Sequence, residues 1–271
     1  MILISFIRRH PVASFFVLAH FLTWGAIPWN SFFAPGALIA AVVVVLVTDG
    51  PRGLLRLGSR LIRWRVSWVW YALAIGVPLF VHFSSTSLNV ALGASTPSLI
   101  MLTPWYGLPL AVAMHIISLG GPLMEEPSFR GFAQPELQKG RSPLAATAIM
   151  AVLVTGWHAP LFFMPVFEAH PIGIVTTLAV TFWYAWLLNQ ASGSVLITVI
   201  AHATEGGVET NSLWGPGADL IRLNFVYATV WCLVALSLLV LYRRFWTRTG
   251  PADGTSEATA PIQPDAVVGL R

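Results

Sequence analysis

Residues 125–131, Glu-Glu-Pro-Ser-Phe-Arg-Gly, constrain the fold of this chain more than any other stretch. Two carboxylates and a guanidinium lie close together between long apolar segments, and ionisable groups at membrane depth are usually paired or functional. On a helix, Glu126 and Arg130 share a face, with the acid in the favourable N-terminal position. Glu125 then points about 100° away and lacks a partner nearby in sequence. Pro127 removes a backbone donor, so we expect the helix to break or restart here.

The composition is that of an integral membrane protein. Hydrophobic residues make up 56% of the 271-residue chain and charged residues 10%, against roughly 25% charged residues in soluble domains. The net charge is +4, but the basic residues lie in short loops between apolar runs, as positive-inside topology requires. We therefore expect membrane lipid as a partner and no nucleic acid.

Hydropathy predicts an all-α fold, a polytopic membrane helical bundle with about eight transmembrane helices. A span needs about 20 mostly apolar residues, and two of the candidates are short. The candidate spans are Pro11–Pro28, Ala34–Thr48, Ser67–Phe83, Tyr106–Met124, Pro143–Phe163, Ile172–Leu188, Val195–Val208 and Asn224–Tyr242.

The placement of arginine predicts the topology and the domain limits. Arg8 and Arg9 put the N-terminus in the cytoplasm, and basic residues after the last span put the C-terminus there too. Arginines and leucines interleave over residues 52–65, which predicts an amphipathic helix at the membrane interface. We expect residues 1–248 to form one transmembrane helical domain and residues 249–271, rich in Pro, Ala, Gly and Thr, to be a disordered cytoplasmic tail.

Two histidines in later spans can complete a site with the carboxylates. His158 lies in the fifth predicted span and His202 in the seventh. Together with Glu125 they match a catalytic zinc site with an open fourth position. They match equally a metal-free arrangement, in which Glu125 activates water and the histidines stabilise an oxyanion. Both mechanisms stay open, and the helix-local zinc motif His-Glu-x-x-His is absent.

The other five histidines flank predicted membrane ends or lack acidic neighbours in sequence. We expect them to be interfacial or packing residues. They are His10, His20, His82, His115 and His170.

Taken together, these motifs resemble the CPBP family of intramembrane proteases, which includes CAAX prenyl endopeptidases and bacteriocin-immunity relatives. The first family motif, Glu-Glu-x-x-x-Arg, is matched by Glu125, Glu126 and Arg130. The second is an aromatic residue followed four positions later by His, here His158. The third is His followed four positions later by Asn, and His202 matches its first position.

The resemblance covers roughly residues 52–206 and implies an eight-helix core with a polar cavity open to the cytoplasmic leaflet. It implies a metalloendopeptidase-like hydrolase of the plasma membrane of a bacterium or archaeon, cleaving membrane-anchored or transmembrane substrates. Glu125 is then the general base, and Glu126 and Arg130 support it. His158 and His202 either join Glu125 as zinc ligands or polarise the scissile carbonyl without a metal.

Two positions depart from the family pattern. Val154 holds the aromatic position, and Gly206 holds the position of the Asn that is thought to help position the reacting carbonyl or water. Glu205 and Glu209 lie near the helix face of His202, so either is a candidate replacement. The departures favour one alternative, a catalytically inactive immunity or scaffold protein of the same fold. A second alternative is a transporter or proton relay, although the chain shows no internal repeat.

Overall fold

The computed structural model describes residues 2–98, 104, 106–208 and 213–248. Within these ranges the chain forms helices and no strand, which confirms the predicted all-α bundle. The predicted tail, 249–271, lies outside the described residues. The helices are α1 (Ile2–Arg9), α2 (Pro11–Trp24), η1 (Ile27–Trp29), α3 (Pro35–Leu61), α4 (Trp68–Ala91), α5 (Gly107–Ile117), α6 (Pro122–Glu126), η3 (Pro127–Ala133), α7 (Gln134–Gln138), α8 (Pro143–Trp157), α9 (Ala159–Phe163), η4 (Pro165–Phe167), α10 (Gly173–Gln190), α11 (Val195–Gly207), α12 (Ala218–Leu241) and α13 (Arg243–Thr247).

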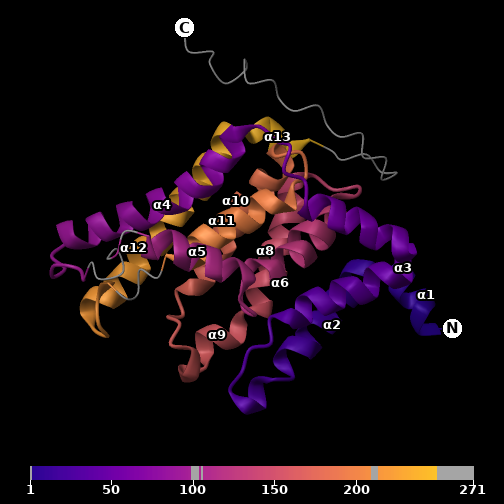
Figure 1. Ribbon diagram of the computed structural model, residues 1–271, viewed down its shortest axis with the longest axis horizontal. Helices are drawn as coiled ribbons and strands as arrows, with labels where there is room; N and C mark the ends of the chain where they lie inside the picture. Colours follow the sequence, from indigo (N-terminus) through magenta and orange to yellow (C-terminus); the bar gives the residue numbers. More distant parts are fainter. Residues whose placement is uncertain (1, 99–103, 105, 209–212, 249–271) are drawn as a thin grey trace, which may run out of the picture.

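The helices pack as two groups that meet around α6 and α8 (Figure 1). In the first group, an apolar cluster that includes Phe129 and Trp157 joins α2 and α3 to η3 and α8. In the second, a cluster that includes Trp183 and Trp231 joins α4, α10, α11 and α12. The charged motif of α6 and η3 therefore lies where these two apolar groups meet.

Hydropathy and length support membrane insertion. Five segments in the described ranges are long and apolar enough to cross a membrane, and α8 and α11 are shorter apolar helices. With α10, these give each of the eight predicted spans a helical counterpart. The five long segments are Pro11–Trp29, Pro35–Leu61, Trp68–Ala91, Gly107–Gln138 and Ala218–Leu241.

A kink at Gly50 joins the second span to the arginine-rich segment. Gly50 has φ 64° and ψ −161°, a conformation that is essentially restricted to glycine. Beyond the kink, the helix predicted over residues 52–65 continues α3 as far as Leu61. Arg60 donates to the carbonyl of Gly131 over 2.7 Å, so this segment is fastened to the charged motif.

Two spans predicted as single helices are divided in the structure. The segment 106–124 breaks between α5 and α6, where Gly121 is extended immediately before Pro122. The segment 143–163 breaks at His158, since Pro160 has no amide hydrogen to continue the ladder of α8. The α-helix ends at Glu126, where the sequence predicted a break or restart, and the chain continues from Pro127 as the π-helix η3, whose wider hydrogen-bond spacing accommodates the missing donor.

We expect Gly50→Ala to destabilise the protein by about 1–3 kcal/mol, because a Cβ disfavours this backbone conformation. Neither Gly50 nor Gly58 has an atom within 4 Å of an added Cβ, so Gly58→Ala is a matched control for side-chain bulk. Gly58 lies in a regular helical turn, where alanine should stabilise by about 0.5–1 kcal/mol. Thermal unfolding in detergent measures both, and equal melting temperatures for the two variants would contradict the assigned kink.

Candidate functional site

The charged motif is buried within the protein. Glu126 is 0% exposed, Arg130 2% and Glu125 5%. A Cβ at Gly131 would lie 2.6 Å from Leu57 Cδ1, so glycine lets η3 pack directly against α3. Gln134, one turn after Arg130, is also fully buried.

Glu126 joins two elements through one carboxylate oxygen. Arg130 Nη1 lies 3.2 Å from Glu126 Oε1, as the spacing predicted. His202 Nδ1, from α11, lies 2.9 Å from the same oxygen. Because a carboxylate paired with a guanidinium only accepts, the His202 Nδ1–H donates to it. Glu126 therefore orients the imidazole of His202 while it neutralises Arg130.

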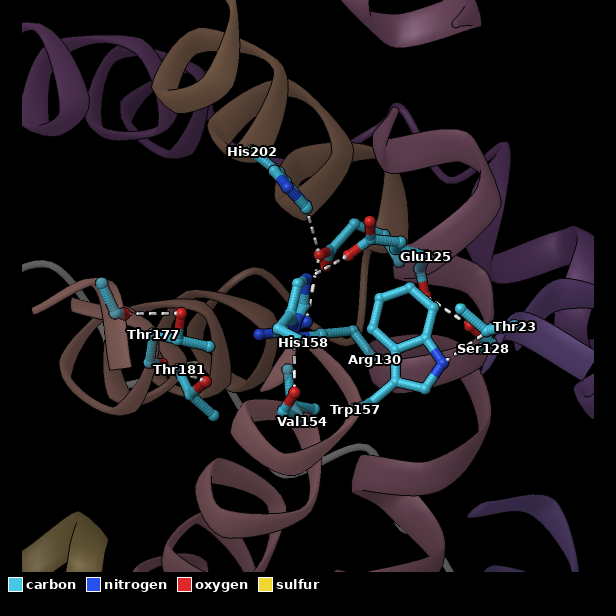
Figure 2. A network of polar contacts seen from close by, with 12 residues as sticks. Thr23, Glu125, Ser128, Arg130, Val154, Trp157, His158, Thr177, Thr181 and His202 are labelled. Atoms are coloured by element: carbon cyan, nitrogen blue, oxygen red, sulfur yellow. Dashed lines mark hydrogen bonds and ion pairs between the residues drawn. The ribbon is translucent and has the colours of Figure 1, made fainter. Parts of the chain in front are cut away.

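Glu125 faces the other predicted histidine. Its Oε2 lies 3.5 Å from His158 Nε2, and Figure 2 shows the rings of His158 and His202 approaching the carboxylates from different helices. His158 Nδ1 lies 2.9 Å from the Val154 carbonyl. A carbonyl only accepts, so Nδ1 carries the proton and Nε2 is the atom presented to Glu125. Val154, which departs from the family's aromatic residue, acts here through its backbone.

The end of α8 is held in place by α2. Trp157 Nε1 donates to Thr23 Oγ1 over 3.0 Å, and Trp24 Nε1 donates to the Trp157 carbonyl over 3.0 Å. Phe32 stacks on the His158 ring at 6.1 Å between centroids. These contacts fix His158 at the helix break, since rotation of α8 would strain all three.

Tyr184 of α10 is a site residue that the sequence did not indicate. Its ring stacks on His202 with 5.4 Å between centroids, and the Arg130 guanidinium lies 4.7 Å above it. A tyrosine within an apolar run has no sequence signal, because its neighbours here come from α11 and η3. Within the part of the chain that the structure describes, three buried polar atoms at this place have no hydrogen-bond partner: Glu126 Oε2, Arg130 Nε and the Tyr184 hydroxyl. Such groups need partners, and water or a peptide backbone can supply them.

The predicted zinc ligands are not grouped around one point. His158 faces Glu125, whereas His202 is bonded to Glu126. Across the described ranges, no three His, Cys, Asp or Glu side chains form a group that could hold a metal ion. In this arrangement the donors do not fit a three-ligand centre. Zinc binding by Glu125, His158 and His202 stays a prediction.

Of the two candidate replacements for the family Asn, Glu205 is the one that lies within the described residues. Glu205 Oε1 accepts a hydrogen bond from the Tyr227 hydroxyl over 2.7 Å, and its carbonyl lies 2.9 Å from His82 Nε2. Its carboxylate is therefore engaged by α12. Glu209 lies outside the described residues.

Comparison with protein families supports the family resemblance. Residues 107–206 match the family model of Rce1-like type II CAAX prenyl endopeptidases. This confirms the resemblance to the CPBP family of intramembrane proteases, and the matched range contains all five predicted site residues. A comparison with curated proteins gives no match.

We expect Arg130→Met to destabilise the protein by about 3–5 kcal/mol, because it leaves the Glu126 charge buried without its cation. Adding Glu126→Gln removes that charge, so the double variant should be more stable than Arg130→Met alone. Thermal unfolding of the two single variants and the double variant gives the coupling directly. Additive effects would show that the two side chains do not interact.

Proposed function

With residues 107–206 matching the Rce1-like family model, we propose that this integral membrane protein is an endopeptidase acting on a peptide bond at or near the membrane. One observation carries the proposal. Two adjacent buried carboxylates each face an imidazole from a different helix, Glu125 facing His158 at 3.5 Å and Glu126 facing His202 at 2.9 Å. Imidazole and carboxylate side chains are the groups that most often serve as general acid and base in hydrolysis.

Glu125 is the general base of the proposed reaction. Glu126 Oε1 already accepts from both Arg130 and His202, so its charge is compensated within the protein. Among the described residues, the Glu125 carboxylate has only the longer contact with His158, which leaves it able to accept a proton from water. Glu126 and Arg130 then act by orienting His202 and by holding the segment that carries Glu125.

The proposed hydrolysis begins when a water oxygen attacks the scissile carbonyl carbon. Glu125 takes the water proton, and the carbonyl π electrons move onto oxygen. A protonated imidazole, His158 or His202, donates to that oxyanion. When the tetrahedral intermediate collapses, the C–N bond breaks and the proton held by Glu125 passes to the leaving amine.

The position of the site favours substrates held at the membrane. It lies among helices that are long and apolar enough to cross a bilayer. A peptide tethered by a lipid anchor or a transmembrane segment reaches such a depth without a soluble domain having to enter the lipid. We therefore propose a membrane-anchored or transmembrane protein or peptide as the substrate. It is cleaved from the cytoplasmic side, because the arginines of residues 52–65 place the C-terminal end of α3 on that side.

A second candidate function is an inactive immunity or scaffold protein of the same fold. Gly206 favours it, because this residue brings no side chain to the position of the family Asn. The two functions differ in a single measurable property, which is whether cleavage depends on Glu125.

We expect Glu125→Gln to lower the rate of peptide cleavage by roughly 10²- to 10⁴-fold, as the loss of a general base does. His158→Ala and His202→Ala should also lower it. Cleavage of internally quenched peptides, with and without a C-terminal prenyl group, by protein in proteoliposomes gives the rates.

The matched controls for these variants lie outside the site. Glu136→Gln removes a carboxylate that pairs with Lys139, and His10→Ala removes an imidazole whose ring contact is with Phe6. Both should cleave at the wild-type rate. If wild type, Glu125→Gln and the controls are equally inactive on every substrate, the scaffold function replaces the enzyme.

Metal content separates the two mechanisms left open by the sequence. Because His158 and His202 face different carboxylates, we expect little zinc in the purified protein and the same amount in His158→Ala. Elemental analysis of both proteins makes the comparison. Stoichiometric zinc in wild type that falls in His158→Ala would overturn the metal-free mechanism.

A further inference from the structure

Two successive glycines at the end of α11 face α5. A Cβ at Gly206 would lie 3.0 Å from Cδ2 and 3.1 Å from Cε1 of His115, and closer still to its Nε2. A Cβ at Gly207 would lie 2.7 Å from the Cα of Val112. Small residues let helices in membranes approach this closely. A side chain at position 207 would overlap the backbone of α5, and one at position 206 would overlap the ring of His115.

The imidazole of His115 fills the place that a side chain at position 206 would take. Residues four apart share a helix face, so position 206 is the neighbour of His202 on α11. The rings of His115 and His202 lie edge to face, with 6.2 Å between centroids. A nitrogen-bearing ring from α5 therefore stands beside His202, where α11 itself offers only backbone.

The end of α5 is tied closely to the start of the charged motif. Ser118 Oγ donates to the His115 carbonyl over 3.0 Å, and the Gly121 amide donates to the Ser118 carbonyl over 3.0 Å. Gly121 also packs so closely on the His115 carbonyl that a Cβ there would overlap it. Four residues later comes Glu125, so this short link fixes His115 relative to the general base.

His115 differs from the other histidines that the sequence assigned to packing. The difference is that the ring of His115 contacts the ring of His202. His10 stacks on Phe6 and His170 on Phe225. Within the described ranges, none of the other four has a ring contact with either site imidazole.

We propose that His115 is a further catalytic residue of this site, supplying from α5 the polar group that Gly206 cannot supply. Its imidazole donates a hydrogen bond to the carbonyl oxygen of the scissile peptide beside His202, as negative charge develops there. This inference rests on the proposed function, because it needs a carbonyl to polarise. It assigns a catalytic role to a residue for which the sequence predicted only packing.

Kinetic constants of three variants test the role of His115. His115→Ala should lower kcat by about 10²- to 10³-fold, as the loss of one oxyanion donor does, with KM changed much less. His115→Leu places an apolar side chain of similar bulk against Gly206, and its kcat should fall by as much as that of His115→Ala. Val112→Ala removes packing between α5 and α11 without touching an imidazole, so it should keep the wild-type kcat.

The decisive variant moves the polar group from α5 to α11. Gly206→Asn alone should inactivate the protein, since its Cβ overlaps the His115 ring. In the double variant His115→Ala/Gly206→Asn, the vacated space accepts the asparagine, and kcat should recover by about tenfold or more relative to His115→Ala. Melting temperatures of all variants show which losses come from misfolding.

Each outcome decides one of the two proposals. If wild type cleaves in a Glu125-dependent way and His115→Leu keeps its kcat, His115 only fills space and the inference is overturned. Failure of the double variant to exceed His115→Ala, when it melts at the same temperature, also overturns it. If wild type shows no Glu125-dependent cleavage, the proposed function itself has failed, and the role of His115 fails with it.

Discussion

The negative charge of Glu126, buried completely and shared between two elements, is the constraint on which the rest of the site depends. A buried carboxylate is tolerated only when its charge is compensated and its oxygens accept hydrogen bonds. Arg130 of η3 and His202 of α11 both contact Glu126 Oε1. The hydrogen bond from His202 therefore ties the charged motif to the second group of helices, and in doing so it sets the position of the adjacent Glu125.

Breaks in the helices position the other side chains of the site. The end of α8 exposes His158, whose Nδ1 is held by the Val154 carbonyl, and the extended link before α6 brings α5 beside α11 (Figure 1). Arg60 fastens α3 to η3 through the Gly131 carbonyl. Irregular backbone within a membrane is tolerated where protein buries it. The site is thus assembled from helix ends rather than from continuous spans.

Periodicity and hydropathy in the sequence predicted the helical class, the candidate spans and the Glu126–Arg130 pair, since each depends on spacing within one segment. The sequence could not assign each histidine to its carboxylate, because that choice depends on how α8 and α11 pack against α6. It also missed the π-helix after Glu126, the stacking of Tyr184 and the contact between His115 and Gly206. Those features arise from tertiary contacts that leave no local pattern.

Chemical cross-linking between α6 and α8 tests the central claim most directly, namely that the carboxylates of α6 meet imidazoles from α8 and α11. Glu125→Cys and His158→Cys can be combined after Cys232→Ser removes the one native thiol. A short bifunctional reagent that fluoresces only on joining two thiols should link this pair in the folded protein, and mass spectrometry should find the two peptides joined. If both thiols react singly but never become linked, Glu125 of α6 and His158 at the end of α8 do not lie side by side.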